Sequence, residues 1–328
     1  MTMIGKGLAG AFAALLMSGA ALAPASAQDD VSLRLNWLMS GVHSIFYLGV
    51  EQGFYEEEGI NLTIGEGQGS ARTVQVVATG GDTFGLADGG SVIAGVSRGA
   101  PLKAVLGVLN TSPFGISFRA DAGVETIKDI EGKTIAATAG EASMALLPAI
   151  WQANDIDESQ VSILNVDGPG KLVAVLEGRT QGLLAGLEGQ VVILNQRGLD
   201  QTVFSFAELG VNTEGLTIVA NDNMISDNPD LVERFVRATR RAMEATIADP
   251  EAAIDAAMAA KPEAERALLA EQLEVSITLM PSPVEPDLPL GQMSAADWER
   301  TLELVTAYQD VQTDLPADSF YTNQFIAQ

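Results

Sequence analysis

The apolar positions of this chain follow two alternating periods. In short runs every second residue is apolar, as in a strand with one buried face, and in longer stretches apolar residues recur every three or four positions, as in a helix. Residues 31–37 alternate and predict a strand, while 43–58 carry helically spaced apolar residues and precede Gly59, a common helix stop. Residues 102–109 are almost wholly apolar, as expected of a strand covered on both faces. Alternating strands and helices predict an α/β fold with mainly parallel sheets flanked by helices.

The alternation runs through two units, and the second interrupts the first. The first unit contains predicted strands at 31–37, 61–64, 83–87 and 102–109 and predicted helices at 43–58, 70–78 and 91–97. The second contains predicted strands at 134–137, 161–164, 182–185 and 202–206 and predicted helices at 142–154, 169–176 and 189–197. Strands near 116–119 and 216–220 lie at the junctions, and helices follow to the C-terminus. We therefore expect lobe one at 28–119 and 213–328, lobe two at 120–212, and two hinge crossings beside a ligand cleft.

The first 27 residues have the pattern of a secretory signal peptide. Lys6 precedes an apolar run at 8–17, and Ala25-Ser26-Ala27 offers an A-x-A cleavage site. The alternative is a membrane anchor, but the run is shorter than the ~20 residues needed to cross a bilayer. Cleavage after Ala27 would release a chain that begins at Gln28. The sequence has no cysteine, hence no disulfide and no lipid-bearing cysteine, which favours the periplasm of a Gram-negative cell.

The charge is strongly negative, with 18 Lys and Arg against 43 Asp and Glu and a formal net charge of −25. Nucleic acids and anionic lipids require a positive surface, so the charge argues against both as partners. Hydrophobic residues make up 47% of the chain, which excludes a disordered acidic polymer. The acidic surface does not identify a ligand.

The residues after the first predicted strand resemble those of a known family. Asn36-Trp37, His43, Phe46-Tyr47, the run 51–55 and Glu58-Gly59 are similar to the opening of the thiamine-pyrimidine-precursor-binding proteins, whose relatives bind sulfonates, taurine or riboflavin. The resemblance covers 31 to about 220. It departs at Asn36, where the family often has Asp, and at 38–41, which replace a frequent Asn-Pro.

This resemblance implies the two-lobed type II periplasmic binding protein fold and a role as the solute-binding component of an ABC importer. The implied partners are a small-molecule ligand and a membrane permease with its cytoplasmic ATPase, and the implied state is a monomer without cofactor. A fungal branch of the family consists of pyrimidine synthases whose chemistry is associated with a cysteine-rich motif. The absence of cysteine counts against that activity here.

Candidate ligand residues follow the predicted strands, because binding crevices in open α/β sheets lie at the carboxyl ends of strands. Trp37 ends the first strand and offers a π-face to an aromatic ring or a cation. His43, the single histidine, matches the family's histidine near the first helix; both a ligand role and a structural role stay open. With no second His or Cys, no metal site of that kind is expected. Tyr47 belongs to the same family motif.

Further candidates lie at other strand and helix ends. Gly69 and Ser70 open a helix whose backbone N–H groups can bind an anion or a carbonyl oxygen, although neither the dinucleotide fingerprint nor the P-loop is present. Asp88 and Asn110 end two strands of lobe one. In lobe two the corresponding residues are Ser143 and Glu188, listed here as candidates with the rest.

Glu188 suggests the ligand, because the thiamine-pyrimidine group often carries a carboxylate at that position. A carboxylate binds an amino-pyrimidine or an amine by charge-assisted hydrogen bonds. We expect a small nitrogen-containing heteroaromatic such as a thiamine-precursor pyrimidine; an alkanesulfonate or taurine, held by helix-start amides, is the alternative. No catalytic residue is predicted, since no nucleophile–histidine motif or metal cluster is visible. A pyrimidine-synthase-like enzyme is the alternative of another class.

Overall fold

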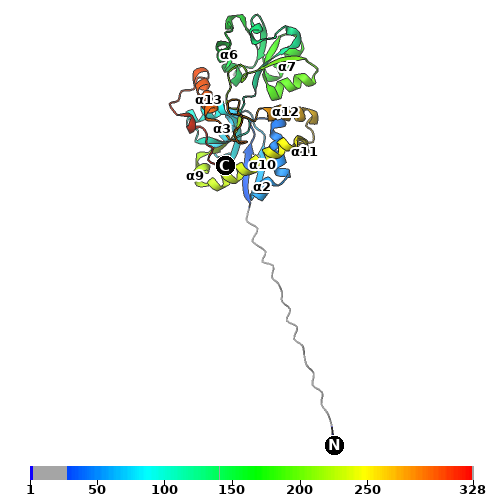
Figure 1. Ribbon diagram of the computed structural model, residues 1–328, viewed down its shortest axis with the longest axis vertical. Helices are drawn as coiled ribbons and strands as arrows, with labels where there is room; N and C mark the ends of the chain where they lie inside the picture. Colours follow the sequence, from blue (N-terminus) through cyan, green and yellow to red (C-terminus); the bar gives the residue numbers. More distant parts are fainter. Residues whose placement is uncertain (3–27, 140, 327–328) are drawn as a thin grey trace.

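The structure is a computed structural model that describes residues 1–2, 28–139 and 141–326. Two lobes lie one above the other, with α6 and α7 in the upper lobe and α2, α9 and α10 in the lower (Figure 1). The two-lobed α/β prediction is confirmed. The predicted signal peptide, 1–27, lies outside the described residues apart from its first two.

Each lobe contains one five-stranded sheet. The first has the order β2-β1-β3-β10-β4 and the second β7-β6-β8-β5-β9. The strands of the first are β1 (Asp29–Arg34), β2 (Ile60–Gly65), β3 (Phe84–Asp88), β4 (Leu102–Gly107) and β10 (Leu216–Asn221). The strands of the second are β5 (Phe114–Arg119), β6 (Thr134–Ala137), β7 (Ser162–Asn165), β8 (Gly182–Gly186) and β9 (Gln201–Ser205).

Both sheets are mixed but mainly parallel, as predicted: in each sheet four strands share one direction and a single strand runs against them. β1 pairs in parallel with β2 and β3, but β10 runs antiparallel to β3 and β4. In lobe two β5 likewise runs antiparallel to β8 and β9. Each antiparallel strand is the first after a crossing between lobes. Each crossing enters its lobe at the edge of the sheet where the parallel strands end. The next strand starts at that edge and therefore runs in the opposite direction.

The strand at 114–119 belongs to the second sheet, whereas the sequence placed residues up to 119 in lobe one. β5 pairs with β8 and β9 along its whole length. The first crossing therefore lies at 108–113, before β5. The second crossing lies between β9 and β10, at 206–215.

The predicted helix at 43–58 divides at a glycine. Helix α1 (Ser44–Glu51) ends before Gly53, whose φ of +73° is the left-handed conformation that glycine adopts without strain. The helices of lobe one's N-terminal part are η1 (Gly41–His43), α1, α2 (Phe54–Glu57), α3 (Ser70–Ala78) and α4 (Gly89–Ser97).

Lobe two carries short helices, and one of them is a π-helical turn. The predicted helix at 142–154 divides at Leu146, and the predicted helix at 189–197 begins as the π-turn η5. These helices are η2 (Ala120–Ala122), η3 (Ile127–Ile130), α5 (Ala142–Ala145), α6 (Leu147–Ala153), η4 (Glu158–Gln160), α7 (Gly168–Leu176), η5 (Leu187–Val191) and α8 (Val192–Gln196).

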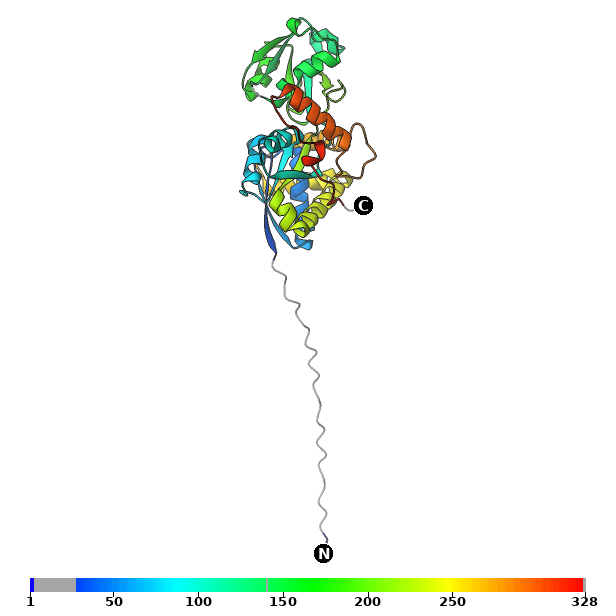
Figure 2. The same ribbon diagram turned by 90° about the vertical axis from the view of Figure 1, so that its left-hand side faces the viewer.

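The chain returns to lobe one and ends in helices. Helices α10 and α11 begin at Pro229 and Pro250, because proline suits the first position of a helix, where no backbone N–H is needed. The helices are α9 (Asp222–Asp227), α10 (Pro229–Ala248), α11 (Pro250–Ala260), α12 (Arg266–Thr278), α13 (Ala295–Tyr308) and η6 (Ala317–Ser319). Figure 2 shows α13 extending along the junction toward the upper lobe. Within the described ranges, no helix is long and apolar enough to cross a membrane.

Helix α10 covers one face of the first sheet through an aromatic stack. Phe235 lies with its ring centroid 4.0 Å from that of Phe84 and 5.5 Å from that of Tyr55, and all three side chains are buried. This cluster joins a C-terminal helix to strand β3 and helix α2 from the N-terminal part of the chain. The rigid base of lobe one therefore depends on contacts between the two ends of the sequence.

Replacing Phe235 tests the contribution of this aromatic cluster to stability. Phe235→Ala should lower the free energy of unfolding by about 3–5 kcal/mol, because it removes buried surface and leaves a cavity. Val284→Ala, at a side chain that is 59% exposed, should change it by no more than about 0.5 kcal/mol. Urea unfolding measures both variants. Equal stability of the two variants would contradict the assigned core.

Candidate functional site

A pocket of about 520 Å³ lies between the two lobes. One wall comes from the loop after β1 and from α12, and the other from the starts of α7 and η5. The lobe-one residues that line it are Asn36, Trp37, Leu38, Met39, Ser40, Val42, His43, Leu216 and Gln272. The lobe-two residues are Gly168, Pro169, Leu172, Glu188, Gly189, Gln190 and Ile193. We call this space the cleft pocket.

The loop 36–43 is fixed by backbone contacts to the glycine-rich turn after β2. Gly67 donates from its backbone N to Trp37 O at 3.0 Å, and Gly69 donates to Asn36 O at 2.7 Å. A Cβ at position 67 would lie 1.9 Å from the carbonyl oxygen of Leu35, so only glycine permits this approach. The loop reaches the cleft in one defined position.

This loop presents apolar side chains to the cleft. Trp37 and Leu38 are each 56% exposed, which is unusual for such large apolar groups. Leu172 and Ile193 line the pocket from the other lobe. A flat ligand between these walls would cover apolar surface on both of its faces.

His43 is held by hydrogen bonds on both ring nitrogens. The backbone N–H of Ser40 donates to Nδ1 at 2.9 Å, so Nδ1 carries no proton. Nε2 therefore carries the proton and donates to Asn36 Oδ1 at 2.8 Å. Burial lowers the pKa of His43 to about 4, although the charge of Glu66 opposes this. His43 is thus a neutral residue that orients Asn36, and a direct ligand role for it stays a prediction.

Three side-chain amides in the cleft pocket share one arrangement. Asn36 accepts from His43 through its oxygen, Gln190 accepts at 2.7 Å from the backbone N–H of Gly186, and Gln272 accepts at 3.1 Å from that of Gly41. Because the donor in each bond is an N–H, the accepting atom of each amide must be its oxygen. The NH₂ group of each amide is not used in these bonds and remains able to donate. Nowhere in the described part of the chain does one of these NH₂ groups meet an acceptor. The pocket therefore offers three oriented donors.

Glu188 supplies the carboxyl group of the pocket. It lies on the π-helical turn η5 directly after β8, a type of turn that is frequent at functional sites. Its Oε2 is buried and has no hydrogen-bond partner among the described residues. Burial raises the pKa of Glu188 to about 7, against a smaller opposing effect of its own backbone N–H. Near neutral pH this group can accept a hydrogen bond or donate one.

The pocket chemistry suits a flat molecule with several acceptors and one donor. The apolar walls would enclose its faces, the three amides would meet its acceptors, and Glu188 would meet its donor. No group of three His, Cys, Asp or Glu side chains that could hold a metal occurs in the described ranges.

Three of the residues predicted from sequence line the cleft pocket: Trp37, His43 and Glu188. Tyr47 instead lines a separate hollow of about 470 Å³ between α1, β2 and α11, where burial raises its pKa. The sequence did not single out the amides. Gln272 lies on a helix more than two hundred residues from Trp37, and no local pattern connects the two.

The remaining predicted residues serve local structure. Asp88 caps α4 by accepting from the backbone N–H of Ser91 at 2.8 Å, and its own N–H donates to Ser70 Oγ at 3.1 Å. Gly69 precedes α3 with a φ of +107° and binds the cleft loop. Asn110 is buried and donates to Gln292 O at 2.9 Å, and Ser143 is buried in α5. None of these five residues lines the cleft pocket, and their predicted ligand role stays a prediction.

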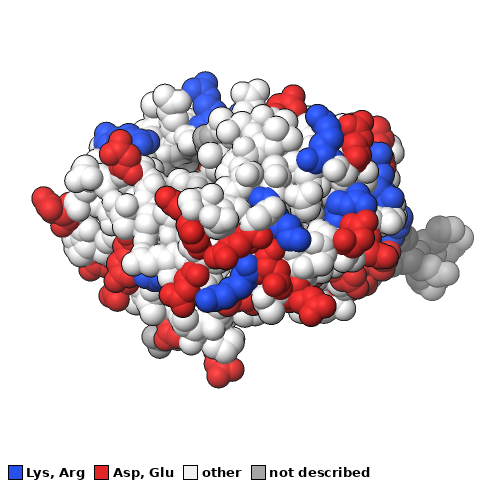
Figure 3. Space-filling view, turned by 90° about the horizontal axis from the view of Figure 1, so that it is seen from above, with Lys and Arg blue, Asp and Glu red and all other residues white. Residues whose placement is uncertain are grey.

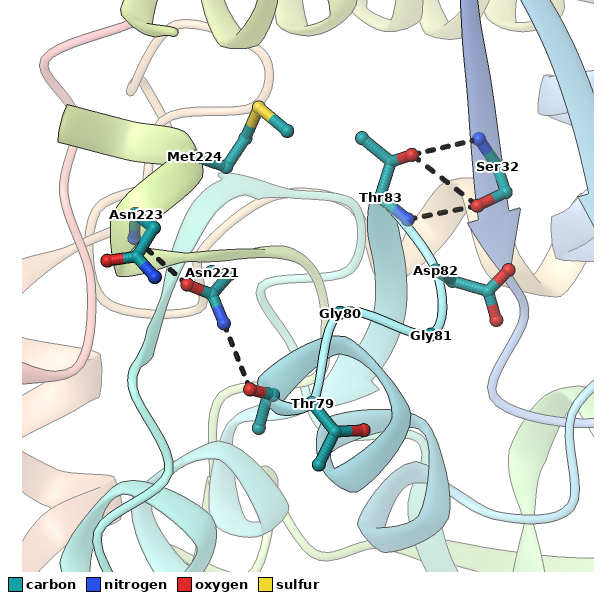
Figure 4. A pocket seen from close by; sticks show the side chains of 10 residues that line it. Ser32, Thr79, Gly80, Gly81, Asp82, Thr83, Asn221, Asn223 and Met224 are labelled. Atoms are coloured by element: carbon teal, nitrogen blue, oxygen red, sulfur yellow. Dashed lines mark hydrogen bonds between the residues drawn. The ribbon is translucent and has the colours of Figure 1, made fainter. Parts of the chain in front are cut away.

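A second hollow, of about 400 Å³, lies at the opposite end of β1 and β3 (Figure 4). Thr83 N donates to Ser32 Oγ at 2.9 Å, and Asn221 Nδ2 donates to Ala78 O at 3.0 Å. These polar groups are engaged by their neighbours, and the carboxylate of Asp82, which also lines the hollow, is paired with Arg34 at 2.8 Å. The cleft pocket is therefore the stronger candidate.

Comparison with known proteins identifies relatives along most of the chain. A family model described as NMT1/THI5 like matches residues 40–253. The riboflavin-binding protein RibY of Chloroflexus aurantiacus is 25% identical over 305 residues, which cover 91% of this chain and 86% of that protein. The formylaminopyrimidine-binding protein of Halalkalibacterium halodurans is 22% identical over 300 residues, covering 90% and 91%.

Other relatives and structures broaden this picture. Proteins named 4-amino-5-hydroxymethyl-2-methylpyrimidine phosphate synthase also match, among them one from Legionella pneumophila. The periplasmic aliphatic sulphonate binding protein SsuA of Escherichia coli has a similar structure, with a TM-score of 0.70 at 14% identity over 88% of this chain and 90% of that one. At this identity the likeness concerns the fold.

The protonation of Glu188 predicts a pH dependence of stability. Its folded pKa of about 7 exceeds its ordinary value of 4.5, so its contribution is complete below pH 4.5 and is lost as the pH rises through about 7. Relative to Glu188→Gln, the unmodified protein should lose about 2 kcal/mol over that interval, a figure reduced for partial solvent access.

Urea unfolding of both proteins across this pH range measures the difference. Other titrating groups are common to the two proteins and cancel in the comparison. Parallel pH profiles would show that Glu188 titrates normally and would contradict the assigned environment.

Proposed function

Because the chain belongs to the NMT1/THI5-like family, we propose that it is a solute-binding protein that captures a small nitrogen-containing heteroaromatic molecule in the cleft pocket. The single observation that carries this proposal is the placement of Trp37 and Glu188 on opposite walls of one pocket between the lobes. An aromatic ring face and an unpaired carboxyl oxygen match the two chemical features of such a ligand. A thiamine-precursor pyrimidine has both features, and the formylaminopyrimidine-binding and riboflavin-binding relatives support the class.

The contacts of a heteroaromatic ligand follow from the side chains. Its ring would stack on Trp37, an interaction worth about 0.5–1.5 kcal/mol beyond the area that it buries. A ring amino group or ring N–H would donate to Glu188, and ring nitrogens or carbonyl oxygens would accept from Asn36, Gln190 or Gln272. Every polar group of the pocket then has a partner.

An alkanesulfonate is the alternative ligand. The three amides could bind sulfonate oxygens, but an ionised Glu188 would repel the anion. The likeness to the SsuA structure is one of fold and does not favour this ligand. Glu188 is the feature that separates the two ligand classes.

An enzyme of the pyrimidine-synthase type is the alternative of another class, because proteins named as such synthases match 71% to 91% of the chain. Two features favour binding instead. The chain has no cysteine, and both nitrogens of His43 are engaged, so this histidine does not offer a free base. The two relatives described above are named as binding proteins.

The same proposal includes the cellular setting. The protein would be exported, would act in the periplasm of a Gram-negative cell as a monomer, and would deliver its ligand to the permease of an ABC importer. Closure of the lobes around the ligand would couple binding to delivery. On the face shown in Figure 3, Lys and Arg side chains lie beside Asp and Glu instead of forming one basic patch, which does not suit a nucleic-acid partner.

A thermal-shift screen tests the proposed ligand class. Pyrimidines, flavins, purines, sulfonates and amines are added separately, and a nitrogen heteroaromatic should raise Tm by several degrees, because a ligand that binds only the folded state stabilises it. A response confined to sulfonates would contradict the role given to Glu188. Turnover of a pyrimidine by the purified protein would contradict the binding function.

Variants locate the bound ligand. Trp37→Ala should weaken binding of the aromatic ligand by at least about tenfold, because the stacking surface is lost. Ile247→Ala, which shortens an exposed apolar side chain on α10 outside the pocket, is the matched control and should leave affinity unchanged. Unchanged affinity in Trp37→Ala would place the site elsewhere.

A further inference from the structure

Helix α13 connects the lobes in addition to the two covalent crossings. Trp298 and Val305 of this helix pack in a core cluster of lobe one, whereas Leu304 packs in the core of lobe two. Tyr308 Oη donates to Gln152 Oε1 on α6 at 2.7 Å. Figure 2 shows the helix lying along the junction. Any turn of one lobe against the other must therefore shift α13 against at least one of them.

A hydrogen-bonded network ties both crossings to this helix. Asn212 of the second crossing accepts from the backbone N–H of Ser112 in the first crossing at 2.9 Å. Its Nδ2 donates to Asp297 Oδ1 on α13 at 3.1 Å. Ser282 lies in the proline-rich loop at 280–289 and donates to the other oxygen of Asp297 at 2.5 Å. Asp297 thus uses both oxygens to hold the crossings and the loop together.

Glu214 of the second crossing lies beside Asp297 but makes no such contacts. It is 1% exposed, and neither of its carboxyl oxygens has a hydrogen-bond partner in the described residues. Its backbone is fixed, because its N–H donates to Thr301 Oγ1 on α13 at 2.7 Å and its carbonyl accepts from Gly89 at 3.2 Å. The second crossing is therefore bound to α13 through its backbone, and the buried carboxyl group lies near the charge of Asp297 on that helix.

The ionisable groups around Glu214 are acidic or neutral. Asp297 faces it from α13, Glu285 adds negative charge near Asp297 from the proline-rich loop, and Tyr321 approaches from the C-terminal segment. On the α4 side the ionisable residue is Asp88, whose carboxylate is engaged by Ser91. Within the described ranges, no Lys or Arg forms an ion pair with Glu214 or Asp297.

We propose that Glu214 and Asp297 form a proton-controlled latch that fastens both hinge crossings to α13 and so determines how freely the lobes turn. With a proton on Glu214, the uncharged carboxyl fits against Asp297, and the latch is closed. When Glu214 loses this proton, two negative charges meet in a space without a cation. The repulsion is relieved when α13 separates from the second crossing and the lobes gain freedom.

The electrostatic environment agrees with this arrangement. Burial raises the pKa of Glu214 well above its usual range, and the neighbouring charge of Asp297 raises it further. Burial also raises the pKa of Asp297, although the hydrogen bonds from Ser282 and Asn212 oppose that shift. A raised folded pKa means that the stabilising effect is complete at low pH and is lost as the pH rises. The latch should therefore open on the alkaline side.

Interlobe distance measurements test the latch without any ligand. The chain has no cysteine, so Glu177→Cys on lobe two and Glu274→Cys on α12 provide two unique spin-label sites. Double electron–electron resonance should give a narrow distance distribution at about pH 5 that broadens or shifts toward about pH 9.5. In Glu214→Gln, which cannot ionise, the narrow distribution should persist at both pH values.

The matched control is Glu188→Gln, which removes a carboxyl with a raised pKa outside the hinge and leaves Glu214 and Asp297 in place. It should retain the pH response of the labelled parent.

The latch is refuted if the parent distance distribution is the same at both pH values, or if the distribution of Glu214→Gln responds to pH as that of the parent does. If Glu214→Gln does not fold, the latch is tested with the parent and Glu188→Gln alone. Loss of the pH response in Glu188→Gln would then show that the response comes from the cleft pocket and would refute the latch. None of these outcomes depends on ligand binding, so the latch and the proposed function fail separately.

Discussion

The hydrogen bond from the backbone N–H of Ser40 to Nδ1 of His43 determines the chemistry of the cleft. A backbone N–H can only donate, so this bond fixes the tautomer of the histidine, and the tautomer in turn fixes which end of the Asn36 amide faces the pocket. The same loop carries Trp37, held by the backbone of Gly67. The Ser40–His43 contact thus fixes a donor, and the contact between Gly67 and Trp37 holds the loop that carries the stacking surface. The single histidine of the chain contributes as a neutral side chain near pH 7, because burial lowers its pKa to about 4.

The topology determines why these groups meet. The parallel strands of both lobes end at the cleft, so the loops after β1 and β8 face each other across it. The two crossings also reach this edge, and for that reason β5 and β10 run against their neighbours. The hinge, the ligand pocket and helix α13 consequently lie in one layer between the lobes. In such an arrangement, ligand binding in the pocket and a change in the contacts of the hinge crossings both affect how one lobe moves against the other.

Much of the fold and part of the cleft pocket could be predicted from the sequence, and the features that were missed have physical causes. Apolar periodicity located the strands and the division into two units, but periodicity does not encode strand direction, so β5 and β10 were not expected to run antiparallel. Trp37 and Glu188 were found because they follow strands and match a family pattern. Asp88 follows a strand too, but a short polar side chain can also cap a helix, and Asp88 caps α4. Ser70 instead accepts a hydrogen bond from the backbone N–H of Asp88. Gln272 and Glu214 became visible only when distant segments met in the fold.

The most direct test of the account is the indole region of a ¹H–¹⁵N NMR spectrum during addition of a heteroaromatic ligand. The chain has three tryptophans: Trp37 is exposed in the cleft, whereas Trp151 and Trp298 are buried in the cores of lobe two and lobe one. The account predicts that the ligand moves the Trp37 indole signal far more than the other two. A ligand that binds while the Trp37 signal stays in place would contradict the assignment of the cleft pocket as the binding site.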